Sequence, residues 1–390
     1  MFLKKLLAEN MPLVEYALFC HNKGTLLPDT YLIDIDQIEE NAQYILHEAN
    51  THNISLYYML KQLGRIPSVG KMLDDMGYRG AVCVDFREAL GLTRHDVRIG
   101  HVGHLSQIPN AALEQILRAK PEIITVYSVE KAAQISEICK QIGFRQDVML
   151  RVIGTKTELF PGQYGGFKYN ELEKTVEKLE KLPGIKIAGV CSFPCFKFDS
   201  KSGEFKPTPN LYTVLDAAKL LKERGFEIKQ INLPSCTCTE SIRIIANEGG
   251  NYGEPGHGLM GTTPYHAACG NGPERPAILY LSEISHNLDG RAYCYGGGWY
   301  RRSGSFDALV GGMSSDAIEV NVISPNQENI DYYFELERFA TVGEPVIMSF
   351  RTQIFVTRSH VAAIRGLKSG HPVIEGIYTS QGEQICGACQ

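Results

Sequence analysis

The sequence predicts an α/β protein in which a (β/α)8 TIM-type barrel, residues 30–271, is followed by a C-terminal β-domain, residues 272–390. Between residues 55 and 260, eight apolar β-branched runs alternate with amphipathic helical patterns, which is typical of βαβ units and a parallel sheet. This count fits a closed barrel better than a Rossmann sheet, and no GxGxxG motif follows an early strand. After residue 272, short apolar runs follow one another across turns without a long helical pattern between them.

The expected elements follow one another along the chain in this alternation. Residues 1–29 are expected to pack on one of the two domains, with the β-domain as the candidate. Barrel strands are expected at residues 56–60, 80–84, 97–102, 122–127, 148–153, 187–193, 228–233 and, more weakly, 252–259. Amphipathic helices are expected at 109–119, 129–142, 170–182 and 211–224. In the β-domain we expect strands at 276–284, 291–295, 317–322, 332–337, 346–350, 353–358 and 361–364.

The composition narrows the class of protein. The net charge is −5 and the hydrophobic content is 44%, which suits an ordinary soluble globule without a nucleic-acid surface. No apolar stretch is long enough for a bilayer, and the start lacks the pattern of a signal peptide, so we expect a cytoplasmic protein with no membrane partner. Eleven cysteines scattered singly are typical of reduced thiols. Cys386 and Cys389 form one CxxC in a tail that we expect to be frayed, and we expect no metal.

Polar residues follow the first, seventh and eighth expected strands. Lys61 closes the run Leu56–Lys61, and a desolvated lysine loses its proton easily and can form a Schiff base with an aldehyde cofactor, although a surface lysine is the alternative. Ser235 and Thr237 follow the seventh strand, and Gly253-Glu254-Pro255-Gly256-His257 follows the eighth. Barrels commonly bind phosphate at these two loops, where glycines let backbone N–H groups approach an anion. The pattern therefore suits a barrel-bound pyridoxal phosphate.

On these residues the chain resembles the fold-type III pyridoxal-phosphate enzymes, the group of alanine racemase and the eukaryotic-type ornithine decarboxylases, and within it the alanine-racemase-like YhfX proteins. The opening Asp34-x-Asp36 with Asn41, the segment Met59-Leu60-Lys61, and Tyr295-Gly296-Gly297-Gly298-Trp299 carry the resemblance as well. The resemblance implies that Lys61 holds the cofactor and that Ser235, Thr237, Gly256 and the backbone of His257 hold its phosphate. It also implies that Tyr295 is a second base reaching across the interface of a homodimer with shared active sites.

Three departures from alanine racemases bear on the chemistry. Glu254 stands where alanine racemases have an arginine and where the decarboxylase branch has a glutamate. A carboxylate there makes the cofactor ring a stronger electron sink. The alternative is that Glu254 only caps a turn. Gln163 replaces the arginine that meets the substrate carboxylate, which implies weaker recognition of that group. Arg65 replaces a tyrosine and could pair with the phosphate or lie in solvent. Arg151, in the fifth expected strand, is a candidate for orienting the substrate or the phenol of Tyr295.

These features predict racemisation of an amino acid or related small amine by two-base proton transfer. Lys61 would act on one face of the substrate and Tyr295 on the other. Two alternatives stay open: a decarboxylase, aldolase or dehydratase of a D-amino acid, and a pyridoxal-phosphate-binding protein without catalysis. The residues do not identify the substrate.

Overall fold

The protein consists of two compact units that the chain enters more than once. The computed structural model describes residues 1–268, 271–304, 307–312, 317–326 and 328–387 of the chain. Unit 1 comprises residues 1–42, 61–66 and 257–390, and unit 2 comprises residues 43–60 and 67–256. The chain therefore passes between the units after residues 42, 60, 66 and 256. This division differs from the expected boundaries at 29/30 and 271/272.

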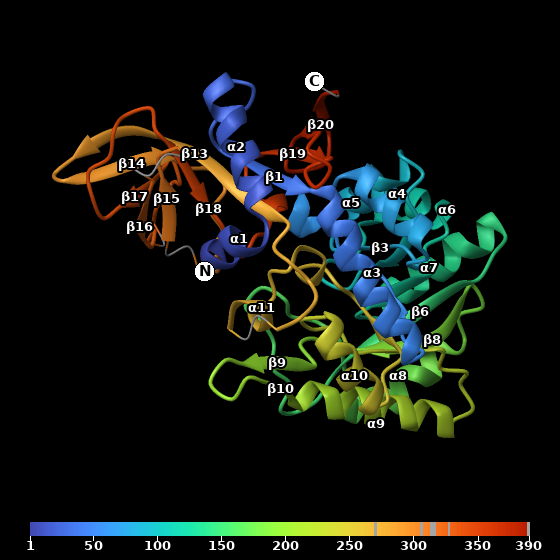
Figure 1. Ribbon diagram of the computed structural model, residues 1–390. Coiled ribbons are helices and arrows are strands. Elements are labelled where there is room, and N and C mark those ends of the chain that lie inside the picture. The colour runs from blue at the N-terminus through green and yellow to red at the C-terminus, as the bar shows by residue number, and fades with distance from the viewer. Residues whose placement is uncertain (269–270, 305–306, 313–316, 327, 388–390) are drawn as a thin grey trace. The chain divides into compact units, whose positions relative to one another are not determined.

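Unit 2 contains a closed ring of eight parallel strands (Figure 1). Around the ring the order is β2-β12-β11-β8-β6-β5-β4-β3, and a bridge from Tyr58 to Ala81, the first residue of β3, closes it. The expected (β/α)8 barrel is thus confirmed, and its eight strands follow one another around the ring in chain order. The strands are β2 (Ser55–Leu56), β3 (Ala81–Cys83), β4 (Ile99–Val102), β5 (Ile123–Val126), β6 (Gln146–Ile153), β8 (Ile185–Cys191), β11 (Gln230–Asn232) and β12 (Tyr252–Gly253), while β7 (Phe167–Lys168) pairs with β6 alone.

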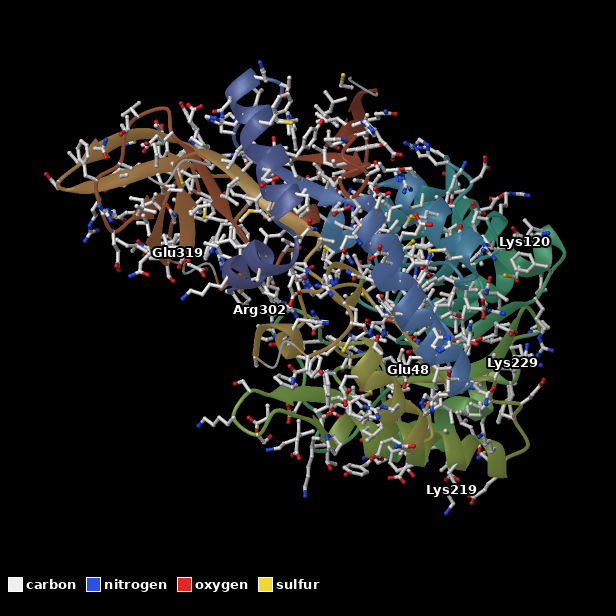
Figure 2. The ribbon with its side chains drawn as sticks, viewed as in Figure 1. Glu48, Lys120, Lys219, Lys229, Arg302 and Glu319 are labelled. Atoms are coloured by element: carbon white, nitrogen blue, oxygen red, sulfur yellow. The ribbon has the colours of Figure 1, made fainter. Side chains whose placement is uncertain are left out.

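Helices cover the outside of these strands, as Figure 1 shows for α5 to α9. Helix α7 begins where Ser128 accepts a hydrogen bond from the N–H of Lys131 and ends at Gly143 in the left-handed conformation. Charged side chains such as Lys219 point away from the strands (Figure 2). The remaining elements are α3 (Ile35–Thr51), which runs from unit 1 into unit 2, α4 (Pro67–Met76), α5 (Phe86–Thr93), α6 (Asn110–Arg118), α7 (Val129–Ile142), η2 (Tyr169–Glu171), α8 (Leu172–Leu179), β9 (Phe196–Asp199), β10 (Glu204–Pro207), α9 (Pro209–Glu223) and α10 (Thr239–Asn247).

The inside of the ring is filled by side chains. A buried cluster joins residues from most of the strands: Tyr57, Val82, Ile123, Met149, Ala188, Cys191 and Tyr252. Gly100 on β4 makes room for one of them, since a Cβ there would lie 2.4 Å from the ring of Tyr57. Each large apolar side chain buried in this way contributes roughly 1.5–3 kcal/mol. The barrel is therefore a packed core, and any site lies at its rim.

Unit 1 is built on a ten-stranded sheet with the order β14-β17-β16-β15-β18-β13-β1-β19-β20-β21. Apolar side chains of α1 (Leu3–Glu9) and α2 (Met11–Lys23) belong to the buried core of this sheet. The strands are β1 (Thr30–Asp34), β13 (Ile278–Leu288), β14 (Arg291–Tyr295), β15 (Asp307–Val310), β16 (Ile318–Ile323), β17 (Tyr333–Leu336), β18 (Pro345–Met348), β19 (His360–Arg365), β20 (Val373–Tyr378) and β21 (Gln384–Cys386). The short helices are η1 (Lys61–Leu63), η3 (Gly258–Met260), α11 (Pro264–Ala268) and η4 (Ile354–Val356).

Several expected elements differ in the structure. The segment at 30–36 was expected to open the barrel, but β1 lies between β13 and β19, antiparallel to the first and parallel to the second. The expected strand at 353–358 is wrong, because its apolar residues form the turn η4, and a short apolar run has no periodicity that distinguishes the two. Strands β15, β20 and β21 were not predicted. Cys386 ends β21 and is not frayed, whereas Cys389 lies outside the described residues.

Among the described residues, no helix combines the length and the apolar character that crossing a bilayer requires.

Candidate active site

The predicted site residues of unit 2 lie toward the carboxyl ends of barrel strands. Arg151 is near the end of β6, and Gln163 follows that strand. The others follow β11 and β12: Ser235, Thr237, Glu254 and Gly256. Because parallel strands of a barrel end on one rim, these residues share the rim where barrel enzymes carry their active sites.

Glu254 is buried and only half of its carboxylate is satisfied. Its Oε1 lies 2.7 Å from Nδ2 of Asn232 and 2.7 Å from Nδ1 of His101. The backbone N–H of Glu254 donates to the hydroxyl of Thr237 at 3.2 Å. Within the described chain, nothing hydrogen-bonds to Oε2, although this atom is also shielded from solvent. Such an oxygen is costly to leave unpaired, so this geometry fits an N–H donor that is not part of the chain.

The segment that precedes Lys61 runs beside the one that contains Glu254. Strand β2 pairs with β12, and beyond the strands the N–H of Met59 donates to the carbonyl of Pro255 at 2.9 Å. The ring closure makes the first and the eighth barrel strands neighbours. The two segments that the sequence singled out separately are therefore held together by backbone hydrogen bonds.

Ser235 connects two loops of the rim. Its Oγ accepts hydrogen bonds from the N–H groups of Cys195 (2.9 Å) and Phe196 (3.1 Å), and its hydroxyl donates to the carbonyl of Pro234. The loop after β8 is thereby fastened to the loop after β11. The hydroxyl that the resemblance assigns to the phosphate thus has partners in the chain, and its phosphate role stays a prediction.

Arg151 is fully buried and its guanidinium holds the loop after its own strand. Nη1 donates to the hydroxyl of Tyr127 at 2.8 Å and to the carbonyl of His104 at 3.3 Å, while Nη2 donates to the carbonyl of Gln163 at 2.8 Å. Gly166, with φ +132°, lets this loop return, since a Cβ there would lie 2.8 Å from the carbonyl oxygen of Arg151. Arg151 therefore shapes the loop, and the Oε1 of Gln163 is buried without a hydrogen bond from any described residue.

In unit 1, Lys61 is the first residue of η1 and does not close a strand as expected. The ring of Phe355 on η4 lies beside two cations: Nζ of Lys61 is 5.9 Å from its centroid and the guanidinium carbon of Arg65 is 4.9 Å away. Arg65 is 3% exposed, so it is not a solvated arginine, and its Nη1 donates to Oε1 of Gln381 at 2.6 Å. Residues of the β-domain therefore form the surroundings of Lys61 and Arg65.

His257 is a neutral side chain surrounded by cations. Desolvation lowers the pKa of His257 well below its usual value, and the charges of Arg351 and Lys61 lower it further. Its Nε2 accepts from Nε of Arg351 at 3.3 Å, so the ring proton belongs on Nδ1, which faces Oγ1 of Thr262 at 3.2 Å. Lys61 and His257 therefore interact electrostatically within unit 1.

Tyr295 ends β14 on the open face of the sheet. It pairs with Tyr333, and 37% of its surface is exposed. The glycines that follow it pass between two carboxylates: a Cβ on Gly297 would overlap Asp29, and the N–H of Trp299 donates to Oδ2 of Asp331 at 3.3 Å. Only glycine permits this path, because φ of Gly297 is +131°.

The carboxyl of Asp331 makes this loop sensitive to pH. Burial raises the pKa of Asp331 to about 6; the N–H of Trp299 opposes the shift and the Asp29 carboxylate adds to it. Because the folded-state pKa lies above the unfolded value, the folded chain loses stability as the pH rises through about 6. We expect Asp331→Asn to raise the free energy of unfolding at pH 8 by about 1 kcal/mol, with the gain gone below pH 4. Urea unfolding at pH 8 and below pH 4 measures the free energies of unfolding, with Asp289→Asn at an exposed position as control. An equal gain in stability at both pH values would contradict the prediction.

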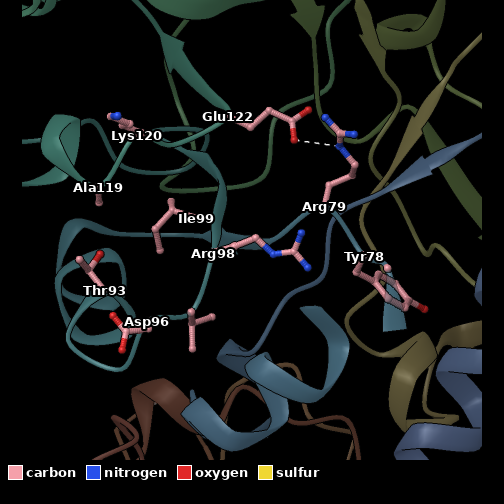
Figure 3. Close-up of a pocket in the computed structure, with 11 residues that line it drawn as sticks. Tyr78, Arg79, Thr93, Asp96, Arg98, Ile99, Ala119, Lys120 and Glu122 are labelled. Atoms are coloured by element: carbon pink, nitrogen blue, oxygen red, sulfur yellow. Dashed lines mark hydrogen bonds and ion pairs between the residues drawn. The ribbon is translucent and has the colours of Figure 1, made fainter. Parts of the chain in front are cut away.

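A pocket of about 660 Å³ opens at the other end of the barrel (Figure 3). Arg79, Arg98 and Lys120 line it, and they precede β3, β4 and β5. The Arg79 guanidinium is paired with Glu122, 2.9 Å from Nε to Oε2. This pocket lies at the amino ends of the strands, and none of the predicted site residues lines it.

Sequence reasoning missed His101, Asn232 and Thr125, which complete the surroundings of Glu254, and Phe355 and Gln381 beside Arg65. The first three are polar residues within apolar strand runs. That pattern was a usable signal, since a polar side chain in a doubly covered strand needs a partner.

The parallel barrel with a buried, half-satisfied carboxylate at the carboxyl ends of its strands places the chain in the class of (β/α)8 barrel proteins that carry their sites at this rim. Residues 33–264 match the family model of the alanine racemase N-terminal domain, and residues 279–374 match that of the YhfX-like C-terminal domain. The chain belongs to the alanine racemase-like family of fold-type III pyridoxal-phosphate proteins, among the YhfX-like members. It is 39% identical to the uncharacterized protein YhfX of Escherichia coli (strain K12) over 386 residues, which cover 99% of this chain and 100% of that one.

Solved structures share the fold at low identity. D-threonine aldolase from Filomicrobium marinum superposes with a TM-score of 0.66 at 14% identity, over 90% of this chain and 94% of that one. Alanine racemase from Bacillus anthracis with bound L-Ala-P gives a TM-score of 0.64 at 17% identity, over 91% and 98%. These likenesses concern the fold and do not separate the two reactions.

Proposed function

We propose that the protein is a pyridoxal-phosphate-dependent enzyme that racemises a small amino compound by proton transfer at the carbon bearing the amine. Members of the alanine racemase-like family bind this cofactor. The observation that carries the proposal is the Oε2 of Glu254, which is buried at the strand ends and receives no hydrogen bond from the described chain. A pyridine ring with a protonated nitrogen supplies the missing donor, so the residues present fit the group.

When bound, pyridoxal phosphate supplies an aldehyde that joins to amines and a ring that takes up an electron pair. Lys61 would hold the aldehyde carbon at rest and afterwards take the proton from one face of the substrate. Glu254 would keep the ring nitrogen protonated, which strengthens the electron sink. Arg65, Ser235, Thr237, Gly256 and the backbone of His257 are the proposed phosphate ligands.

Tyr295 of the partner subunit would serve the opposite face of the substrate. In this chain the side chain is partly exposed on the face of a sheet, where a second subunit can reach it. We therefore propose a homodimer in which each active site takes its second base from the other protomer. The substrate would be a small amine or amino acid that meets Gln163 in place of an arginine, so its anionic group is bound without a bidentate fork.

Tyr295→Phe tests the two-base arrangement. We expect the variant to bind the cofactor as the wild type does and to lose proton exchange with solvent from one enantiomer only, with racemisation reduced on the order of 10² to 10⁴-fold. Deuterium incorporation into each enantiomer, followed by NMR, measures this. Tyr333→Phe, on the paired strand, is the matched control. Equal exchange from both enantiomers in Tyr295→Phe would refute the two-base mechanism.

The direct test of the proposed function is the absorption spectrum of the purified protein before and after borohydride reduction, followed by peptide mass analysis. A visible band that disappears on reduction, with a pyridoxyl adduct on Lys61, is the expected result. A colourless protein that takes up no added pyridoxal phosphate would overturn the proposal.

A lyase reaction on the same cofactor is the second candidate. Glu254 favours it, because a strong electron sink also serves decarboxylation and aldol cleavage, and the fold matches D-threonine aldolase as well as alanine racemase. Carbon dioxide, an aldehyde or a keto acid among the products would decide for the lyase.

A further inference from the structure

His101 and Glu254 form a buried pair inside the barrel rim that the proposed proton transfer does not use. Neither side chain is exposed to solvent by more than 1%, and Nδ1 of the histidine lies 2.7 Å from Oε1 of the glutamate. The other ring nitrogen, Nε2, lies 2.6 Å from the hydroxyl oxygen of Thr125. His101, on β4, is therefore held at both ring nitrogens. Nδ1 contacts Glu254, which follows β12, and Nε2 contacts Thr125 on β5.

The protons of this chain of groups can be assigned from the donors present. Asn232 donates an N–H to Oε1 of Glu254 at 2.7 Å, and an ionised carboxylate can only accept. Nδ1 of His101 must therefore carry a proton to meet the same oxygen. The neutral ring then accepts at Nε2, and the hydroxyl proton of Thr125 points to it. The hydroxyl of Thr125 thus donates to His101, and His101 donates to the carboxylate of Glu254.

The two donors on Oε1 also determine where the second oxygen points. With His101 and Asn232 both bound to Oε1, the carboxylate cannot rotate without breaking two buried hydrogen bonds. Its Oε2 is left on the side that neither donor occupies, with no described residue as its partner. The histidine therefore orients the carboxylate.

We propose that His101 is a positioning residue for the cofactor: its Nδ1–H holds Oε1 of Glu254 and so aims Oε2 at the ring nitrogen, which stays protonated. The inference rests on the proposed function, because it concerns the same cofactor. Without the donor, only Asn232 holds Oε1 of Glu254, and Oε2 is expected to turn away from the ring nitrogen. The proton affinity of the ring nitrogen should then fall by about tenfold to a hundredfold.

The test uses pyridoxal phosphate labelled with ¹⁵N in the ring, bound to the full-length protein, and reads the protonation of the ring nitrogen by NMR over a range of pH. His101→Phe removes the donor and keeps a planar ring. His101→Asn restores an amide N–H close to the position of Nδ1. His104→Phe is the matched control, since this neighbouring buried ring, 5.4 Å from His101 between centroids, faces Cys191 Sγ.

We expect a pyridinium signal in the wild type, in His104→Phe and in His101→Asn, and a signal shifted toward neutral pyridine at the same pH in His101→Phe. A pyridinium signal in His101→Phe equal to the wild type, with the cofactor still attached to Lys61, would overturn the inference and leave the proposed function intact. If the wild-type protein binds no cofactor, both the inference and the proposed function are wrong.

A second measurement needs no substitution at all. In ¹⁵N-histidine-labelled wild-type protein with its cofactor, Nδ1 of His101 is expected to carry a proton. A proton on Nε2 alone would overturn the inference even if His101→Phe fails to fold.

Discussion

Lys61→Ala is expected to abolish the covalent attachment of pyridoxal phosphate and to reduce turnover by at least roughly 10³-fold, because in the proposed function this one side chain is both the anchor and a base. The variant would lose the residue that would hold the cofactor and one of the two proposed proton-transfer groups together. The fold should survive the substitution, since Lys61 lies in a single helical turn and its Nζ lies over the ring of Phe355 and not in a hydrophobic core.

The measurement is the visible spectrum with borohydride labelling, combined with the rate of solvent-proton exchange. Lys71→Ala is the matched control, because Lys71 is an exposed lysine on α4 ten residues further along the chain. A pyridoxyl adduct on another lysine in Lys61→Ala, or exchange at the wild-type rate, would show that Lys61 does not hold the cofactor.

Glu254→Gln is expected to keep the shape of the rim and to lose most of the activity. The carbonyl oxygen of the new amide can still accept from Asn232 and His101, so the two buried hydrogen bonds survive. In place of Oε2 stands an NH₂ group, which donates and cannot receive the proton of a pyridinium. We expect turnover to fall on the order of 10² to 10³-fold, with the cofactor still bound.

Steady-state kinetics and the ring-nitrogen NMR signal measure this effect. Glu122→Gln is the control, because Glu122 is another carboxylate of the barrel that accepts from a residue of β12, Tyr252 at 2.9 Å, but stands at the amino end. A Glu254→Gln variant with wild-type turnover and a pyridinium signal would show that the carboxylate does not act on the ring.

Much of the fold was predictable because its signals are local. Apolar runs of strand length alternate with helical patterns from Ser55 to Gly253, and every one of the eight barrel strands lies in or beside an expected run. The place of β1 was not predictable in this way. All five residues of β1 are buried, and a barrel strand has the same continuous apolar pattern. Its partners β13 and β19 are remote in sequence. Pairing over such distances leaves no trace in local periodicity.

Some residues of the candidate site could likewise be predicted from the sequence, and others could not. Glu254 and Lys61 were singled out because they follow the eighth and the first expected strands, and their roles stay predictions. The backbone hydrogen bond from Met59 to Pro255 joins the segments of unit 2 that lie next to them in sequence. His101 and Asn232 were left out, because a polar residue in a strand indicates only that some partner exists. Which partner it meets depends on the register of strands β4, β11 and β12 around the ring, and that is a property of the folded barrel.

The position of β1 has a consequence for how the chain is made. Thr30 pairs with Leu281 on one side and with His360 on the other. A ribosome must therefore release nearly the whole chain before the first strand has its neighbours. Domains generally fold as units during synthesis. Because the last barrel strand ends at Gly253, unit 2 can fold before α1, α2 and β1 have their partners in unit 1. Until then the apolar faces of these first helices are exposed, and this nascent segment is where we expect a holding chaperone to bind.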